Sequence, residues 1–229
     1  MGGSCGPTAL NSFACAGGTV GALAGGTNAF AQGGTDPETL GFSATFADGV
    51  SSHASGINCR VDSAAYGARA AGGDANATRP YQDVYACRTA GNASNTQTSK
   101  LVMGRQNTGL APNQAIELKF GLNGSQFLSL EDDRAYVFTI AAVATAVIGV
   151  QVSRGWTFAF SAHRDGGVSV ISGAGPVDTY GDAPADWQFV AAVAAGPDRI
   201  ALTFTIGAVA VRANCVARVE FTEVATPAP

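Results

Sequence analysis

Residues 16–39 read AGGTVGAL, AGGTNAFA and QGGTDPET, three consecutive octads that each contain a Gly-Gly-Thr triplet. Glycine adopts backbone conformations that other residues avoid, so glycine at a fixed short period predicts turns at fixed places. Such a chain winds into a narrow rod or coil. The stretch therefore favours a structural or surface-display protein over an enzyme built around a pocket.

The small-residue character continues to residue 79 with a different spacing. ADG at 47–49 and ASG at 54–56 lie seven residues apart, and AYG at 65–67 repeats the theme. This pattern predicts short strands joined by tight turns and stacked into a β-roll, in which each coil needs neighbours above and below it. The alternative is a flexible linker of glycine and alanine.

From about Tyr81 onward, apolar residues alternate with other residues, which is the signature of half-buried strands. Gly-rich and Asn-Gly turn signals separate these runs, and strands at such short intervals are typical of a sandwich or jelly roll. The alternating residues are Ile116, Leu118 and Phe120; Trp156, Phe158 and Phe160; Ile200, Leu202, Phe204 and Ile206; and Cys215, Ala217, Val219 and Phe221.

We therefore predict an all-β protein with two parts. Residues 1–79 form a Gly/Ala-rich β-roll or extended segment for attachment and trimerisation. Residues 80–229 form an antiparallel β-sandwich that resembles a jelly roll. The nearly uncharged stretch at 135–152 has the character of a membrane span, but Gly149 interrupts it and its flanks look like strands. We expect two buried strands with a turn there, and no membrane segment.

The composition limits the classes of partner. Only 13% of the residues are charged, against about 25% in ordinary domains, and 8% are aromatic although 46% are hydrophobic. Small side chains bury little area each, so we expect backbone pairing or subunit contacts to stabilise the fold. The net charge of −4 and the lack of a basic stripe argue against nucleic acid as a partner.

The cysteines are odd in number and widely spaced, without a C-x-x-C pair, which argues against a zinc site and against a disulfide framework. We expect free thiols that act as small apolar residues. The opening MGGSCGPTAL lacks the basic region and long apolar core of a signal peptide, so we expect no secretion. The cysteines are Cys5, Cys15, Cys59, Cys87 and Cys215.

The sequence contains residues that match catalytic patterns, but their context does not support catalysis. Residues 2–6 match G-x-S-x-G around Ser4, but a nucleophile elbow needs a strand before it and a helix after it. His53 and His163 are the two histidines, and a hydrolase triad would need one of them beside a nucleophile and a carboxylate. His163 and Asp165 adjoin a Gly-Gly turn, so a solvated hairpin tip is the better interpretation.

Acidic and aromatic residues provide a further test. Paired carboxylates perform glycoside hydrolysis or bind Ca²⁺, and tryptophans stack on sugars. Acids near turns more often solvate them, and a tryptophan that begins an alternating strand more often packs in a core. We therefore assign no catalytic, cofactor-binding or metal-binding residue, no cofactor and no enzymatic activity. The residues considered are Glu131, Asp132 and Asp133; Asp178, Asp182 and Asp186; and Trp156 and Trp187.

Residues 81–224 contain the segments YQDVYACRTAGNASNTQTSKLVM (81–103), AIELKFGLNG (115–124) and LSLEDDRAYVFTIAAVATA (128–146), followed by GWTFAFSAHRDGG, ADWQFVAAV, IALTFTIG and VRANCVARVEFTEV. In these segments the chain resembles a domain of bacteriophage tail-fibre and virion structural proteins. The last strand in that family has an Arg-Trp pair, whereas Ala213 follows Arg212 here. The Ala-x-Gly segment at 41–79 also resembles the β-roll heads of trimeric fibres and adhesins.

The resemblance implies a homotrimeric, β-rich part of a phage particle, made in the host cytoplasm and exposed on the virion surface. Our first hypothesis is a surface decoration, cement or head-fibre protein that stabilises the capsid by contacts with the major capsid protein or other virion proteins. The alternative is a short tail fibre that binds a host receptor or glycan. A carbohydrate-binding or depolymerising module would need Asp182, Asp186 and Trp187 exposed together. A bacterial trimeric adhesin is disfavoured by the missing signal.

Overall fold

The computed structural model describes residues 4–5, 10–15, 22–34, 45–86, 96–120, 127–173, 175–194 and 199–225. Every regular element among these residues is a β-strand, so the all-β prediction is confirmed. No helix in this part of the chain has the length and apolar character to cross a membrane. The chain divides into two compact units, Met1–Lys100 and Leu101–Pro229.

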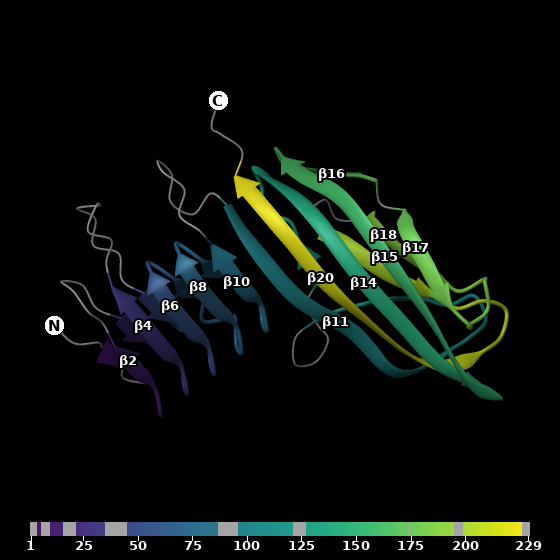
Figure 1. The fold of residues 1–229 in the computed structure, drawn as a ribbon, viewed down its shortest axis with the longest axis horizontal. Coiled ribbons are helices and arrows are strands. Elements are labelled where there is room, and N and C mark those ends of the chain that lie inside the picture. Colours follow the sequence, from purple (N-terminus) through teal and green to yellow (C-terminus); the bar gives the residue numbers. More distant parts are fainter. Residues whose placement is uncertain are drawn as a thin grey trace. The chain divides into compact units, whose positions relative to one another are not determined.

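The first unit consists of two parallel sheets between which the chain alternates. One strand from each sheet, with the connecting turns, makes one coil, and the described residues contain five coils stacked in sequence order (Figure 1). One sheet contains β1 (Ser4–Cys5), β3 (Ala22–Ala24), β5 (Thr45–Ala47), β7 (Arg60–Val61) and β9 (Asn76–Ala77). The other contains β2 (Phe13–Cys15), β4 (Phe30–Gly34), β6 (His53–Ile57), β8 (Arg69–Gly73) and β10 (Asp83–Ala86).

Small side chains fill the space between these two sheets. Ala31, Ala54, Ala70 and Val84 are in register on successive strands, and all four are fully buried. Each such residue removes little apolar area from water, so pairing with the adjacent coils contributes much of the stability of each coil. Alanine also lets the two sheets approach closely, which explains why this part of the chain contains so many small residues.

One corner of each coil has the same backbone geometry. Asn28, Ser51, Gly67 and Tyr81 all have positive φ, and each stands two residues before a strand. Their amide groups donate to carbonyl oxygens of the preceding coil at 2.8–3.0 Å. The corners are therefore hydrogen-bonded to one another along the stack, as the strands are.

The octads do not set the period of this stack, and the prediction of equivalent turns at each triplet was wrong. Residues 25–27 lie at a corner, whereas Gly33 and Gly34 belong to β4. The first triplet, at 17–19, lies outside the described residues. The coils also differ in length, because Phe30, His53, Arg69 and Asp83 occupy one register position at unequal spacing.

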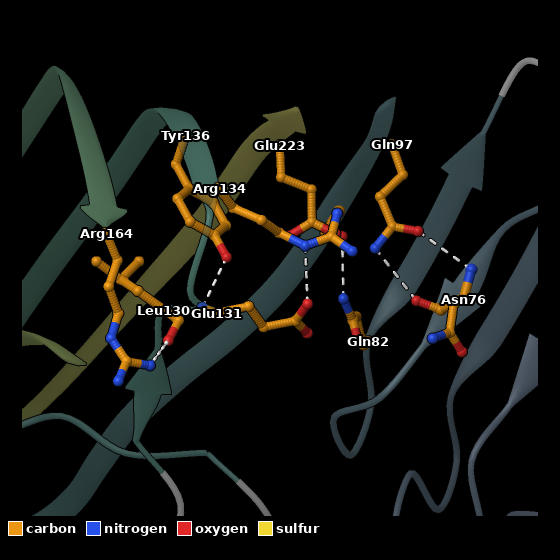
Figure 2. Close-up of polar contacts among 10 residues, drawn as sticks. Asn76, Gln82, Gln97, Leu130, Glu131, Arg134, Tyr136, Arg164 and Glu223 are labelled. Atoms are coloured by element: carbon orange, nitrogen blue, oxygen red, sulfur yellow. Dashed lines mark hydrogen bonds and ion pairs between the residues drawn. The ribbon is translucent and has the colours of Figure 1, made fainter. Parts of the chain in front are cut away.

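The last coil is completed by residues beyond the predicted boundary at 79/80. β10 pairs antiparallel with the start of β11 (Thr96–Leu110). The Gln97 side chain donates to the Asn76 carbonyl oxygen at 3.3 Å and accepts from the Asn76 amide at 3.1 Å (Figure 2). It thus hydrogen-bonds the backbone of β9 as a neighbouring strand would. The first unit accordingly extends to Lys100.

The second unit contains a large sheet in the order β16-β15-β14-β20-β11, with β17 also paired to β15 (Figure 1). All pairings among β14, β15, β16, β17 and β20 are antiparallel. The strands are β14 (Arg134–Ile148), β15 (Val150–Asp165), β16 (Val168–Ser172), β17 (Pro176–Gly181) and β20 (Val211–Ala225).

A smaller antiparallel sheet is centred on β19 (Arg199–Thr205). β18 (Gln188–Val193) pairs with one edge of β19, while β12 (Ala115–Glu117) and β13 (Leu128–Ser129) pair with the other. Trp156 of β15 contacts Phe189 of β18 and Phe204 of β19, with ring centroids 5.7 and 5.9 Å apart. The two sheets therefore pack against each other through aromatic side chains.

The predicted alternation within this unit is confirmed. The inward residues of the four predicted runs are all buried in one hydrophobic core. The stretch at 135–152 forms two antiparallel strands that turn at Gly149, whose φ is +75°, and each strand buries one face. The strands β14, β15 and β16 are joined consecutively as antiparallel hairpins. The resemblance to a jelly roll stays a prediction.

Candidate functional site

The formal nucleophile Ser4 and His53 belong to the first unit, and His163 belongs to the second. Ser4 belongs to the short strand β1, which pairs parallel with β3. His53 lies on β6 in the first unit, where its ring meets the Phe30 ring edge-on at 4.6 Å. His163 is exposed on β15, and Asp165 pairs with Val168 at the hairpin tip. The predicted solvated tip is confirmed.

The acidic cluster at 131–133 has structural partners. Glu131 forms an ion pair with Arg134 at 2.9 Å, and Asp132 accepts a hydrogen bond from the Gly167 amide at 3.1 Å. Asp133 has positive φ at a turn. These contacts agree with the expectation that the acids serve turns and strand ends.

The residues proposed for a sugar-stacking platform are not exposed together. Asp182 and Asp186 are exposed, but Trp187 is only 3% exposed and packs on Phe204 at 5.4 Å. Asp182 accepts from the Ser153 amide at 2.7 Å, and this hydrogen bond holds the pKa of its carboxyl below the ordinary value. Asp186 accepts from the Ala208 amide at 3.0 Å. The platform hypothesis for this cluster therefore fails.

A different concavity lies between β15, β17 and β18 of the second unit. It has a volume of about 300 Å³, the lower end of the range for small-molecule pockets. Aromatic side chains form much of its wall, with polar groups from three residues. The lining residues are Arg154, Trp156, Pro176, Thr179, Trp187, Gln188, Phe189 and Val190.

Arg154 supplies the charge of this pocket. Its Nη1 donates to the carbonyl oxygens of Ala183 and Pro184 at 3.2 and 2.9 Å, which fixes the guanidinium beside the loop after β17. The same loop is tied to β15 because the amides of Asp182 and Ala183 donate to the Ser153 carbonyl oxygen. The Nε of Arg154 makes no hydrogen bond. Sequence reasoning identified the two tryptophans but missed Arg154, because residues 154 and 183–184 meet only through pairing of β15 with β17.

Among the described residues that line the pocket, the side chains offer a guanidinium, an amide and a hydroxyl. These groups can bind a ligand through hydrogen bonds and charge. A neutral or anionic group of small size fits the pocket, with apolar faces around it and one fixed cation.

The cysteines described by the structure are free thiols. Cys15 is exposed, whereas Cys59 and Cys215 are buried. Burial raises the pKa of the Cys59 thiol and raises that of Cys215 to about 12, so these two stay protonated and act as apolar residues. Cys5 and Cys87 lie where no side chain is described. Among the described residues, no three His, Cys, Asp or Glu side chains form a group suited to a metal ion.

Comparison with known proteins finds only weak similarity. No family model matches the sequence, and no curated protein matches it. Similar solved structures include the tailspike protein of Acinetobacter phage vB_ApiP_P1, with 11% identity and a TM-score of 0.29. Another is the tailspike gp49 of the Acinetobacter baumannii bacteriophage Fri1, a capsular polysaccharide depolymerase, with 9% identity and a TM-score of 0.30. The matches cover 98% of this chain but only 40% and 38% of those chains.

Proposed function

We propose that this protein is a structural component of a bacteriophage tail, a short fibre or spike that contacts the host surface without enzymatic activity. The observation that carries the proposal is the stack of parallel coils in the first unit, held by backbone ladders around a core of alanine. Such a stack is a stiff, repetitive support whose shape does not depend on a ligand. The sequence resemblance of residues 81–224 to phage fibre proteins supports the same function.

The pocket around Arg154 is the candidate contact for a receptor group. It combines aromatic walls with a fixed cation, and the acidic residues at 182 and 186 are not among its lining residues. This composition supports recognition of a small surface group, such as part of a glycan, in preference to its cleavage.

The second candidate is a decoration protein on the capsid. One observation favours it: among the described residues, β1 and β2 are the end strands of their sheets at the amino-terminal end of the stack. The edge of an end strand can pair with a strand of another chain, such as a capsid subunit. In both candidates the protein assembles with copies of itself, and it is located on the virion surface.

Antibody labelling of intact phage particles, viewed by electron microscopy, tests the proposal. Label at the tail supports the fibre, whereas label spread over the head supports decoration and overturns the tail assignment. Particles that carry no label, although the protein is present in infected cells, overturn both. Adsorption provides a functional test. Purified protein added to host cells should compete with phage and reduce its adsorption if the protein is the receptor-binding fibre.

A further inference from the structure

The outward face of β14 and β15 carries one charged residue, Asp165, at the hairpin tip where β15 ends. Fifteen alternate positions on these two strands point away from the core, and none of the other fourteen is Lys, Arg, Asp or Glu. We call this surface the open face. Its residues are Ala135, Val137, Thr139, Ala141, Val143, Thr145 and Val147 on β14, and Gln151, Ser153, Gly155, Thr157, Ala159, Ser161 and His163 on β15.

Several side chains of the open face are apolar and exposed to solvent. Val137, Val143 and Val147 are 61%, 46% and 69% exposed. The apolar surface continues onto β16, where Val170 pairs with His163 and Val168 pairs with Asp165. The solvent-exposed face of an antiparallel sheet normally carries polar and charged residues. The centres of protein interfaces, in contrast, are depleted of charged residues. The open face has the composition of an interface centre.

The size of the face matches what a stable complex buries. β14 and β15 pair through nearly their whole lengths, which at about 3.3 Å per residue makes a face about 50 Å long. With the flanking strands β16 and β20, which have 5 and 15 residues, and about 4.8 Å between strands, the area is about 800 Å². A standard interface buries about 800 Å² on each partner.

The charge pattern identifies the occupant. A partner with a charged surface would find no opposite charge at the fourteen positions of the open face. A second copy of the open face needs none, because small and β-branched side chains of two such faces interdigitate when sheets pack about 10 Å apart. On β20 beside it, Arg218 and Glu220 already form an ion pair with each other at 3.4 Å. We propose that the open face is the surface through which copies of this chain associate.

Two matched substitutions test this inference, which does not depend on the location of the protein in a phage particle. Val143 on the open face and Val190 on β18 are both strand valines, 46% and 45% exposed. Light scattering after size exclusion should give the unaltered protein a whole multiple of 23.0 kDa. Val143→Glu should reduce the mass to that of one chain, because assembly would bury its carboxylate without a partner. Val190→Glu should keep the multiple.

A crosslinking measurement keeps the test independent of folding defects in Val143→Glu. In a Cys15→Ser background, Thr139→Cys should give a covalent multimer with a short bismaleimide, and Val190→Cys should give no more than the background protein. A single-chain mass for the unaltered protein at micromolar concentration overturns the inference. So does a multiple that persists in Val143→Glu, equal loss of mass in both glutamate variants, or equal crosslinking in both cysteine variants.

Discussion

Gly56 shows why single positions in the first unit admit no side chain. Its φ is +121°, and a Cβ there would collide with the carbonyl oxygen of Gly72 in the next coil. Gly33 has the same relation to Gly56, and Gly72 has it to Ala86. Glycine is needed here for close approach of successive coils, and at Gly56 and Gly72 also for backbone conformation.

Gly56→Ala should lower the free energy of unfolding by about 1–3 kcal/mol, because the alanine is strained at this φ and pushes two coils apart. Gly109→Ala is the matched control, since a Cβ at that exposed strand position meets nothing within 4 Å. Chemical denaturation followed by circular dichroism measures both. Equal stability of the two variants would show that the coils are not packed as closely as described.

His53 makes the first unit sensitive to acid. Burial, and secondly the nearby positive charge of Arg69, lower its pKa from 6.5. The unfolded chain then binds more protons than the folded chain, so stability falls as the pH drops below about 6.5 and through the folded pKa. In the stack, Phe30, His53 and Arg69 are in register on adjacent strands.

His53→Phe should reduce the fall in melting temperature between about pH 7 and pH 5.5, because it removes this proton linkage and keeps an aromatic ring beside Phe30. Melting curves of the variant and the unaltered protein at several pH values measure the difference. The difference in melting temperature should be constant above about pH 7.5, where His53 is uncharged in both the folded and the unfolded chain. An unchanged pH dependence would contradict the assigned direction of the pKa.

At the scale of elements, the ends of β14 and β20 are held by a buried ion pair. Arg134 Nη1 lies 3.7 Å from Glu223, which is only 1% exposed, while Arg134 Nε lies 2.9 Å from the more exposed Glu131 (Figure 2). Glu223 points to the core side of β20, as Phe221 and Val219 do. The same arginine therefore serves a buried carboxylate and a solvated one.

Arg134→Ala should lower the free energy of unfolding by about 3 kcal/mol, since it takes a cation away from a carboxylate that has little contact with water. Glu131→Ala should lower it by less than about 1 kcal/mol, because water screens the exposed pair. Denaturant titrations of both variants give the comparison. A larger effect of Glu131→Ala would mean that the exposed pair, not the buried one, holds the strand ends.

At the scale of the whole molecule, the two units are stabilised in different ways. Among the described residues, the core of the first is composed of alanine with one cysteine and two valines, and that of the second is rich in aromatic and branched side chains. The described members of the second core all lie between Leu101 and Phe221. Burial of large side chains contributes more per residue than burial of alanine, so the second unit has the larger hydrophobic stabilisation.

A fragment of residues 96–229 should fold when expressed alone, because it retains β11 and the complete second core. It should show cooperative unfolding and blue-shifted tryptophan emission, since Trp156 and Trp187 both lie in this core. Heating the fragment while recording fluorescence provides the measurement. A fragment with the emission of exposed tryptophan and no cooperative transition would show that the second unit needs the first 95 residues.

The sequence alone determined the strand class and the inward face of each long strand. Trp156, Phe158 and Phe160 could be assigned to a core because a strand presents alternate residues to one side whatever it pairs with. Gly149 could be assigned to a turn for a similarly local reason. The tertiary structure decided which coil stacks on which, and that Gln97 completes β9, Arg154 meets the carbonyls of Ala183 and Pro184, and Phe30 stands beside His53. These contacts depend on the register between strands separated by connections of unequal length, and no local period in the chain encodes that register.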